Sequence, residues 1–128
     1  MPVIAIGASA GGLEPLEDFF HKAPFLDGWC FVIVQHLSPD YRSMMDELLG
    51  RCTKMRIVHI QDGMTLTPDT IFLNGPNSVV TLEGDTLRMR PFQAGDRVPN
   101  LPIDALFLSL TQRPVESTFA VVLSGSGS

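Results

Sequence analysis

The chain has 128 residues, which is enough for one domain and too few for two of ordinary size. Hydrophobic residues make up 45% and charged residues 18%, which excludes a disordered chain and predicts a buried core. The net charge of −5 argues against a nucleic-acid partner, which usually requires a basic patch. We find no apolar run long enough to insert in a membrane and no signal peptide. Cys30 and Cys52 are too few for a disulfide framework, so we expect free thiols in a cytoplasmic protein.

The first half of the chain alternates short apolar runs with amphipathic segments. Residues 2–6 predict a buried strand, and a glycine-rich turn leads into a helix at residues 13–22 that Pro24 stops. A second buried strand is expected at residues 30–34, followed by a helix at residues 41–52.

The second half adds strands at residues 56–60 and 70–73, then an antiparallel hairpin turned by Glu83-Gly84-Asp85. The remaining expected elements are the hairpin strands 79–82 and 86–89, a helix at 103–112 and a last strand at 118–123. Strands that alternate with helices predict an α/β fold, with a mostly parallel sheet, helices on both faces and a small antiparallel hairpin.

The strongest chemical motif is G-x-S-x-G at residues 7–11, between a predicted strand and a predicted helix. In that context the motif is typical of a nucleophile elbow, where glycines permit a sharp turn and expose the serine hydroxyl. Ser9 is therefore the candidate nucleophile, and the Ala10 N–H is a candidate oxyanion-hole donor. The alternatives are a plain glycine packing turn and a phosphate-binding loop, although the spacing matches neither G-x-G-x-x-G nor a P-loop.

His36 lies just beyond the C-terminal end of the second predicted strand, residues 30–34, as Ser9 lies just beyond that of the first, residues 2–6. If these strands are parallel neighbours, both residues lie at one edge of the sheet and can act as nucleophile and general base. A histidine that caps a loop is the competing interpretation. We interpret His21 and His59 as structural, and we expect no metal site and no cofactor because no Cys/His spacing resembles a zinc site.

A catalytic triad also needs an acid that orients the histidine. Asp62 is the nearest approach to a carboxylate placed after a strand, and Asp104 opens a helix. The most suitable location, after residues 118–123, holds Ser-Gly-Ser-Gly-Ser instead.

Four segments together resemble the catalytic domain of the CheB-type chemotaxis protein-glutamate methylesterases. The segments are I-G-A-S-A-G-G (6–12), V-I-V-Q-H-L (32–37), L-P-I-D-A-L-F (101–107) and V-V-L-S-G-S-G-S (121–128), in the family's order. The resemblance implies an α/β fold with a parallel sheet and a Ser-His-Asp triad. It also implies hydrolysis of glutamate methyl esters, and in many members glutamine deamidation, on the cytoplasmic helices of methyl-accepting chemoreceptors.

Carried over by motif, the nucleophile is Ser9, the base is His36, and the backbones of Ala10 and Ser126 contribute to the oxyanion hole. The family often has Thr at the position of Ala10 and Met at that of Ser126, which leaves side-chain contacts there open. The family's acid would directly follow Ser128. We therefore expect residues 1–128 to be a methylesterase catalytic domain that is incomplete at its C-terminus and nearly inactive alone.

No receiver domain precedes the first strand, and the P-I-D and S-G-S-G-S segments look more like methylesterase domains fused to a CheR-type methyltransferase. We therefore expect a larger parent protein. The alternative function is a non-catalytic module that holds receptor helices in the same cleft. A nucleotide-binding domain is a third possibility, and it rests on the glycine turn alone.

Overall fold

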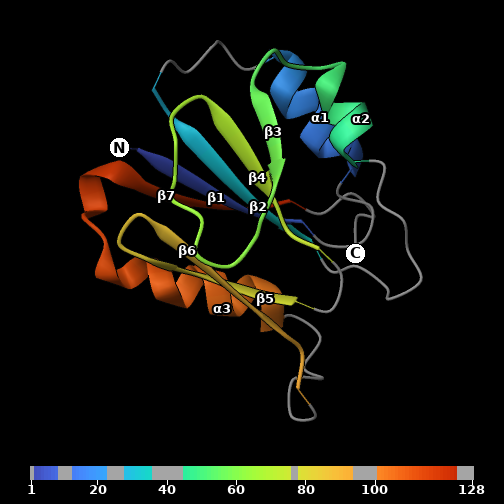
Figure 1. The fold of residues 1–128 in the computed structure, drawn as a ribbon. Coiled ribbons are helices and arrows are strands. Elements are labelled where there is room, and N and C mark those ends of the chain that lie inside the picture. The colour runs from blue at the N-terminus through green and yellow to red at the C-terminus, as the bar shows by residue number, and fades with distance from the viewer. Residues whose placement is uncertain are drawn as a thin grey trace.

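A computed structural model describes residues 2–8, 13–22, 28–35, 45–75, 78–93 and 101–123. Its main body is a five-stranded sheet with the order β3-β4-β2-β1-β7, in which every neighbouring pair is parallel (Figure 1). The strands are β1 (Val3–Ala8), β2 (Cys30–Gln35), β3 (Arg56–His59), β4 (Thr70–Leu73) and β7 (Thr118–Leu123).

A second, two-stranded antiparallel sheet and three helices complete the described elements. The hairpin consists of β5 (Ser78–Glu83) and β6 (Thr86–Pro91). The helices are α1 (Leu13–Lys22), α2 (Met45–Gly50) and α3 (Leu101–Ser109), with 3-10 turns at Leu110–Gln112 (η1) and Val115–Ser117 (η2). The expected α/β fold with its small hairpin is confirmed.

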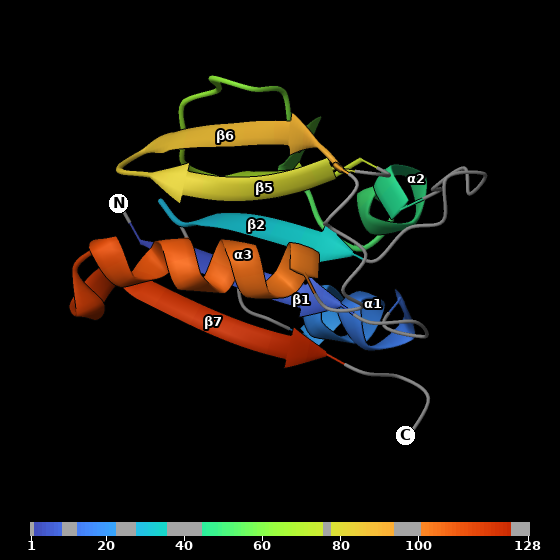
Figure 2. The same cartoon turned by 90° about the horizontal axis from the view of Figure 1, so that it is seen from below.

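Two hydrophobic cores lie on opposite faces of the parallel sheet. Ile4, Ile6 and Phe31 face α1 and α2, whereas Val3 and Val32 face α3 and the hairpin. Figures 1 and 2 show α3 and the hairpin on one side of the sheet, with α1 and α2 on the other. Strands covered on both faces carry continuous apolar runs, which is why β1 and most of β2 are buried along their length.

Several element boundaries differ from expectation, most of them by one or two residues. β1 was expected to end at Ile6, but Gly7 and Ala8 continue it and pair with both β2 and β7. The helix expected at 41–52 is described as α2, which ends at Gly50, and residues 41–44 lie outside the described part. Residues 51 and 52 form a turn after α2, because Arg51 N–H donates to Leu48 O in the tighter 3-10 pattern.

The helix expected at 103–112 begins two residues earlier, at Leu101, and changes to the 3-10 form at Leu110. Its early start is explained by Pro102, since proline lacks an N–H and is well tolerated in the first turn of a helix. Both cysteines are free thiols, as expected.

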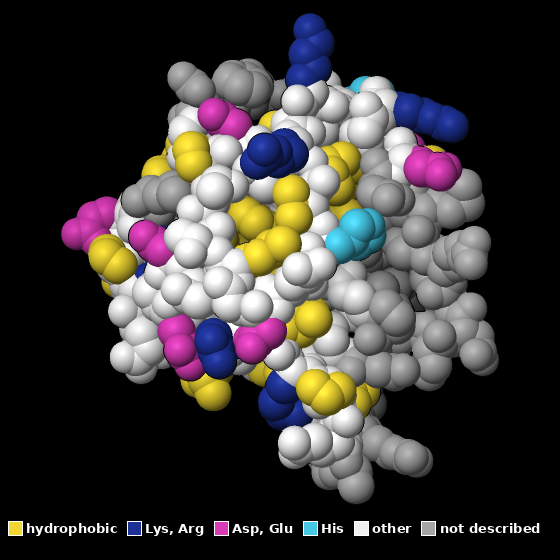
Figure 3. Space-filling model, in the orientation of Figure 1, with side chains coloured by type: hydrophobic (Ala, Val, Ile, Leu, Met, Phe, Trp, Pro, Cys, Tyr) yellow, Lys and Arg dark blue, Asp and Glu magenta, His cyan; other side chains and the backbone are white. Residues whose placement is uncertain are grey.

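Charged side chains are scattered over the surface. On the face in Figure 3, basic and acidic side chains are interspersed, with hydrophobic side chains between them. Arg88 and Asp62, for example, form an exposed pair with 3.5 Å between Nε and Oδ1. None of the helices in the described residues is long and apolar enough to cross a membrane.

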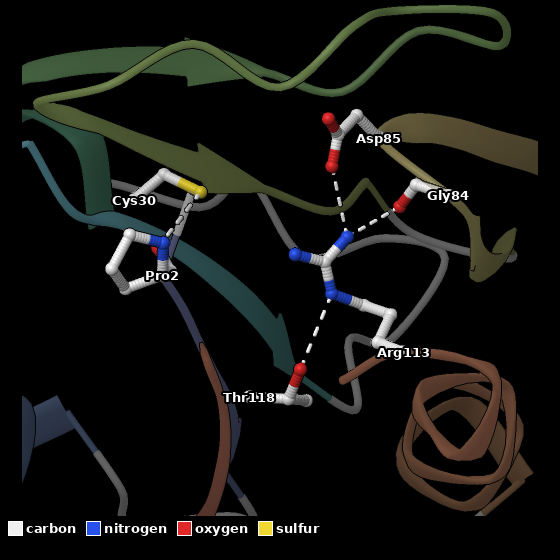
Figure 4. Close-up of polar contacts among 6 residues, drawn as sticks. All are labelled: Pro2, Cys30, Gly84, Asp85, Arg113 and Thr118. Carbon is white, nitrogen blue, oxygen red and sulfur yellow. Dashed lines mark hydrogen bonds and ion pairs between the residues drawn. The ribbon is translucent and has the colours of Figure 1, made fainter. Parts of the chain in front are cut away.

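Arg113 connects three elements at the amino-terminal edge of the sheet (Figure 4). Its guanidinium donates to Gly84 O and to Asp85 Oδ1 in the β5–β6 turn, the latter at 2.9 Å, and to Thr118 Oγ1 at the start of β7 at 3.3 Å. The Arg113 side chain is only 6% exposed and that of Asp85 is 57% exposed, so this polar link between the hairpin and the sheet is buried on its arginine side.

Candidate active site

The carboxyl ends of three neighbouring strands lie side by side in the sheet. Ala8, the last residue of β1, is in register with Gln35 at the end of β2 and with Leu123 at the end of β7. Neighbouring strands are about 4.8 Å apart, so these three ends form one compact edge. The expectation that the strands before Ser9 and His36 are parallel neighbours is confirmed.

The candidate residues Ser9, Ala10, His36 and Ser126 themselves lie outside the described residues. The structure places the strand residues that precede them in the sequence. Ser9 follows β1 directly, His36 follows β2 directly, and Ser126 is three residues beyond β7. That Ser9 and His36 act together as nucleophile and general base stays a prediction.

Asn74 connects the ends of β4 and β2 just before His36. Its carboxamide oxygen accepts from Gln35 N–H at 3.0 Å, and its amide nitrogen donates to Gln35 O at 2.9 Å. Its own backbone N–H donates to Ile33 O at 3.2 Å, and its side chain is buried. Nothing local in the sequence indicates that Asn74 has a partner 39 residues away.

Gly7 allows α3 to approach the end of β1. A Cβ atom at Gly7 would lie 2.6 Å from Cγ2 of Ile103, in the first turn of α3. The interpretation of Gly7 as a turn glycine is wrong, since the residue is extended strand paired on both sides. Because Gly7 has no side chain, α3 can pack closely against β1.

The described aspartates are engaged elsewhere or lie on the surface. Asp62 follows β3, the far edge strand, and accepts from Met89 N–H at 2.9 Å. Asp104 is exposed in the first turn of α3. The residues that directly follow β1, β2 and β7 lie outside the described part, and in the sequence they are Ser9, His36 and Ser124.

The other candidates from the sequence lie at the surface. His21 is exposed in the last turn of α1, and His59 is exposed at the end of β3. In the parts of the chain that the structure describes, no group of three His, Cys, Asp or Glu residues could hold a metal ion. An open cavity of about 310 Å³ lies on the hairpin, and its lining includes Asp62, Thr81 and Arg88 rather than the ends of β1 and β2.

The fold and the position of the motifs define an α/β domain with its candidate residues beyond the carboxyl edge of a parallel sheet, where sites in such domains usually form. The family model for CheB methylesterase matches residues 4–128. The crystal structure of the Thermotoga maritima CheB methylesterase catalytic domain has the same fold, with a TM-score of 0.74 at 18% identity. The match covers 98% of this chain and 68% of that one.

Two sequence relatives illustrate the range of similarity. A protein-glutamate methylesterase/protein-glutamine glutaminase 2 of Shewanella sp. (strain MR-4) is 29% identical over 98% of this chain and 36% of its own length. An uncharacterized 104.1 kDa protein of Rhodobacter capsulatus is 48% identical over 66% of this chain and 9% of its own length. The chain thus spans about a third of the length of the Shewanella protein. It belongs to the CheB methylesterase family.

Proposed function

We propose that residues 1–128 form the catalytic core of a protein-glutamate methylesterase, with Ser9 as nucleophile and His36 as general base. The observation that carries the proposal is the register of the sheet, in which Ala8 pairs with Gln35. Residues that directly follow two paired positions begin from backbone about one strand spacing apart. A nucleophile and its base need that proximity.

The proposed reaction is acyl transfer in two steps. Ser9 Oγ attacks the ester carbonyl carbon of a methylated glutamate while His36 takes the hydroxyl proton. The resulting oxyanion is stabilised by the backbone N–H groups of Ala10 and Ser126. His36 then returns the proton to the leaving methanol, and in the second step activates a water that hydrolyses the glutamyl ester on Ser9. The products are a glutamate carboxylate, methanol and free Ser9.

The proposed substrates are methyl-accepting chemoreceptors, on their cytoplasmic helices, as the family membership suggests. Deamidation of receptor glutamines follows the same route, with ammonia as the leaving group in place of methanol. The name of the Shewanella relative includes both activities. A fused methyltransferase domain in the parent protein is part of the proposal, and the 104.1 kDa Rhodobacter relative is large enough to hold further domains.

Covalent labelling of Ser9 tests the nucleophile and separates an enzyme from a receptor-binding module. A serine-directed fluorophosphonate should add its mass to the peptide that contains Ser9, and His36→Ala should slow the addition by at least about a hundred-fold. Ser9→Ala should abolish it. A folded chain that binds receptor helices but leaves Ser9 unlabelled would favour the binding module.

Methyl ester hydrolysis by residues 1–128 alone is proposed to be very slow. The reason is that Asp62 lies beyond the far edge strand β3 and Asp104 is exposed on α3, so neither is placed to orient His36. Removal of the triad acid in serine proteases costs about ten-thousand-fold in turnover. A form extended through the rest of the domain should hydrolyse a methylated receptor fragment much faster. Equal rates of hydrolysis for both forms would favour Asp62 or Asp104 as the acid that orients His36.

A further inference from the structure

We propose that Asn74 is a positioning residue for His36, acting through the backbone of Gln35. The inference rests on the proposed function, in which His36 is the general base. It is carried by the two hydrogen bonds between the Asn74 carboxamide and both backbone groups of Gln35, at 3.0 and 2.9 Å.

The Asn74 side chain takes the place of a missing strand residue. The ladder between β2 and β4 ends at the pair Ile33–Leu73, so β2 extends two residues beyond its partner. A carboxamide has the donor and acceptor of a peptide group, and here it pairs with Gln35 as the next strand residue would. With Asn74 N–H bonded to Ile33 O, three hydrogen bonds hold the end of β2 on this side.

The anchored carbonyl belongs to the peptide group that joins Gln35 to His36. Because that group is planar, fixing Gln35 O and Gln35 N–H restricts the direction in which the chain continues to His36. A general base must lie within about 3.2 Å of the proton that it takes, and a misplacement of about 1 Å can cost about a hundred-fold in rate. The held backbone therefore serves the geometry of the base.

We call the two hydrogen bonds between the Asn74 carboxamide and the Gln35 backbone the clamp. The clamp needs both a donor and an acceptor, which is why an amide suits this position. An alanine would remove both bonds to Gln35. An aspartate has nearly the same shape, but its ionised form can only accept, so it would bond Gln35 N–H and repel Gln35 O. Protonation of that aspartate would restore the donor, which makes Asn74→Asp a pH-controlled version of the clamp.

The experiment compares Asn74→Ala and Asn74→Asp with the unmodified chain. We expect the fluorophosphonate to label Ser9 about a hundred-fold more slowly in Asn74→Ala. For Asn74→Asp the labelling rate, relative to the unmodified chain at the same pH, should rise as the pH falls. NMR should show the His36 imidazole signals shifted or broadened in Asn74→Ala and in Asn74→Asp at high pH.

Thr70→Val is the matched control. Thr70 is buried at the other end of β4, and its hydroxyl bonds Pro68 O at 3.0 Å and Thr67 Oγ1 at 2.9 Å. This variant also loses buried hydrogen bonds, but it should leave the labelling rate and the His36 signals unchanged.

The two proposals fail separately. Absence of Ser9 labelling in the unmodified chain refutes the proposed function, whereas the His36 signals test the clamp whether or not Ser9 reacts. Folded Asn74 variants with unchanged His36 signals would overturn the inference. If Asn74→Ala does not fold, Asn74→Asp would overturn the inference equally if its labelling rate and His36 signals match those of the unmodified chain at every pH.

Discussion

Gly7 packs directly against Ile103 of α3, so its replacement should disturb the packing of α3 on β1. In Gly7→Ala the new methyl group would meet Cγ2 of Ile103, which is attached directly to a β-branched carbon and has little freedom in a helix. We expect a loss of about 1–3 kcal/mol in the free energy of unfolding, measured by urea denaturation.

Gly50→Ala is the control for that substitution. Gly50 ends α2 and has no atom within 4 Å of the position that its Cβ would take, so this variant should be unchanged or slightly more stable. In the Gly7→Ala background, Ile103→Ala should cost less than it does alone because it relieves the clash. Strict additivity of the two changes would contradict the packing role of Gly7.

The Cys30 thiol makes stability depend on pH in the alkaline range. Burial raises the pKa of Cys30 to about 11 from 9.0, with the negative charge of Asp85 adding to the rise and the positive charge of Arg113 opposing it. The folded state thus holds the thiol proton more tightly than the unfolded state. This contribution is fully present below about pH 9 and is lost as the pH rises from 9 towards 11.

Cys30→Ala should therefore have a flatter decline of the free energy of unfolding between pH 9 and 11 than the unmodified chain. Urea denaturation at a series of pH values measures the two slopes. Cys52→Ala should keep most of the decline, since Cys52 is only partly buried. Parallel curves for Cys30→Ala and the unmodified chain would show that the Cys30 thiol does not contribute.

At the scale of elements, Arg113 holds the hairpin turn against the first residue of β7. Removing its side chain in Arg113→Ala leaves Gly84 O and Thr118 without this partner, and Asp85 without its cation. Because Asp85 is more than half exposed, we expect a loss of about 2 kcal/mol rather than the larger cost of a fully buried pair. Chemical denaturation gives the value.

Arg88→Ala provides the comparison, since Arg88 lies in β6 of the same hairpin and also pairs with an aspartate, Asp62. Both Arg88 and Asp62 are about half exposed and 3.5 Å apart, so this variant should lose less than about 1 kcal/mol. Arg113→Lys keeps the charge but not the planar fork, so its stability should lie between those of Arg113→Ala and the unmodified chain. Similar losses in the free energy of unfolding for Arg88→Ala and Arg113→Ala would mean that the burial of Arg113 does not strengthen its contacts.

Elements with strong local signals could be predicted from the sequence. The apolar runs of β4 and β7 and the glycine in the β5–β6 turn fix these elements within one or two residues, and α1 has the predicted bounds. Gly7 was misplaced because a glycine inside a strand and a glycine in a turn look alike in the sequence. The pairing of Gly7 with both β2 and β7 and its contact with α3 distinguish them.

The candidate site was predictable only to the level of its strands. The parallel pairing of β1 with β2 follows from the alternation of strands and helices. The Asn74 clamp depends on β4 lying beside β2, which in turn depends on how segments 39 residues apart pack. No local pattern predicts such a contact, so Asn74 could be found only in the folded chain.

At the scale of the whole molecule, β7 combines the sequence of a central strand with an exposed position. Its six residues carry no charge, yet within the described residues it pairs on one side only, with β1. Phe119 is 46% exposed although it stacks on Trp29, and Val122 is 61% exposed. An uncharged apolar edge strand can pair with another chain through its free backbone groups.

We therefore expect residues 1–128 to associate reversibly through β7, with a concentration-dependent mass in sedimentation equilibrium. Val122→Lys places a charge on this edge strand and should shift the chain towards the monomer, because a lysine on an edge strand opposes pairing with another strand. Leu108→Lys is the matched control, as Leu108 is 73% exposed and lies on α3 rather than on a strand. It should leave the association unchanged. An equal effect of both lysines would attribute association to general apolar surface, and a monomer at every concentration would refute pairing through β7.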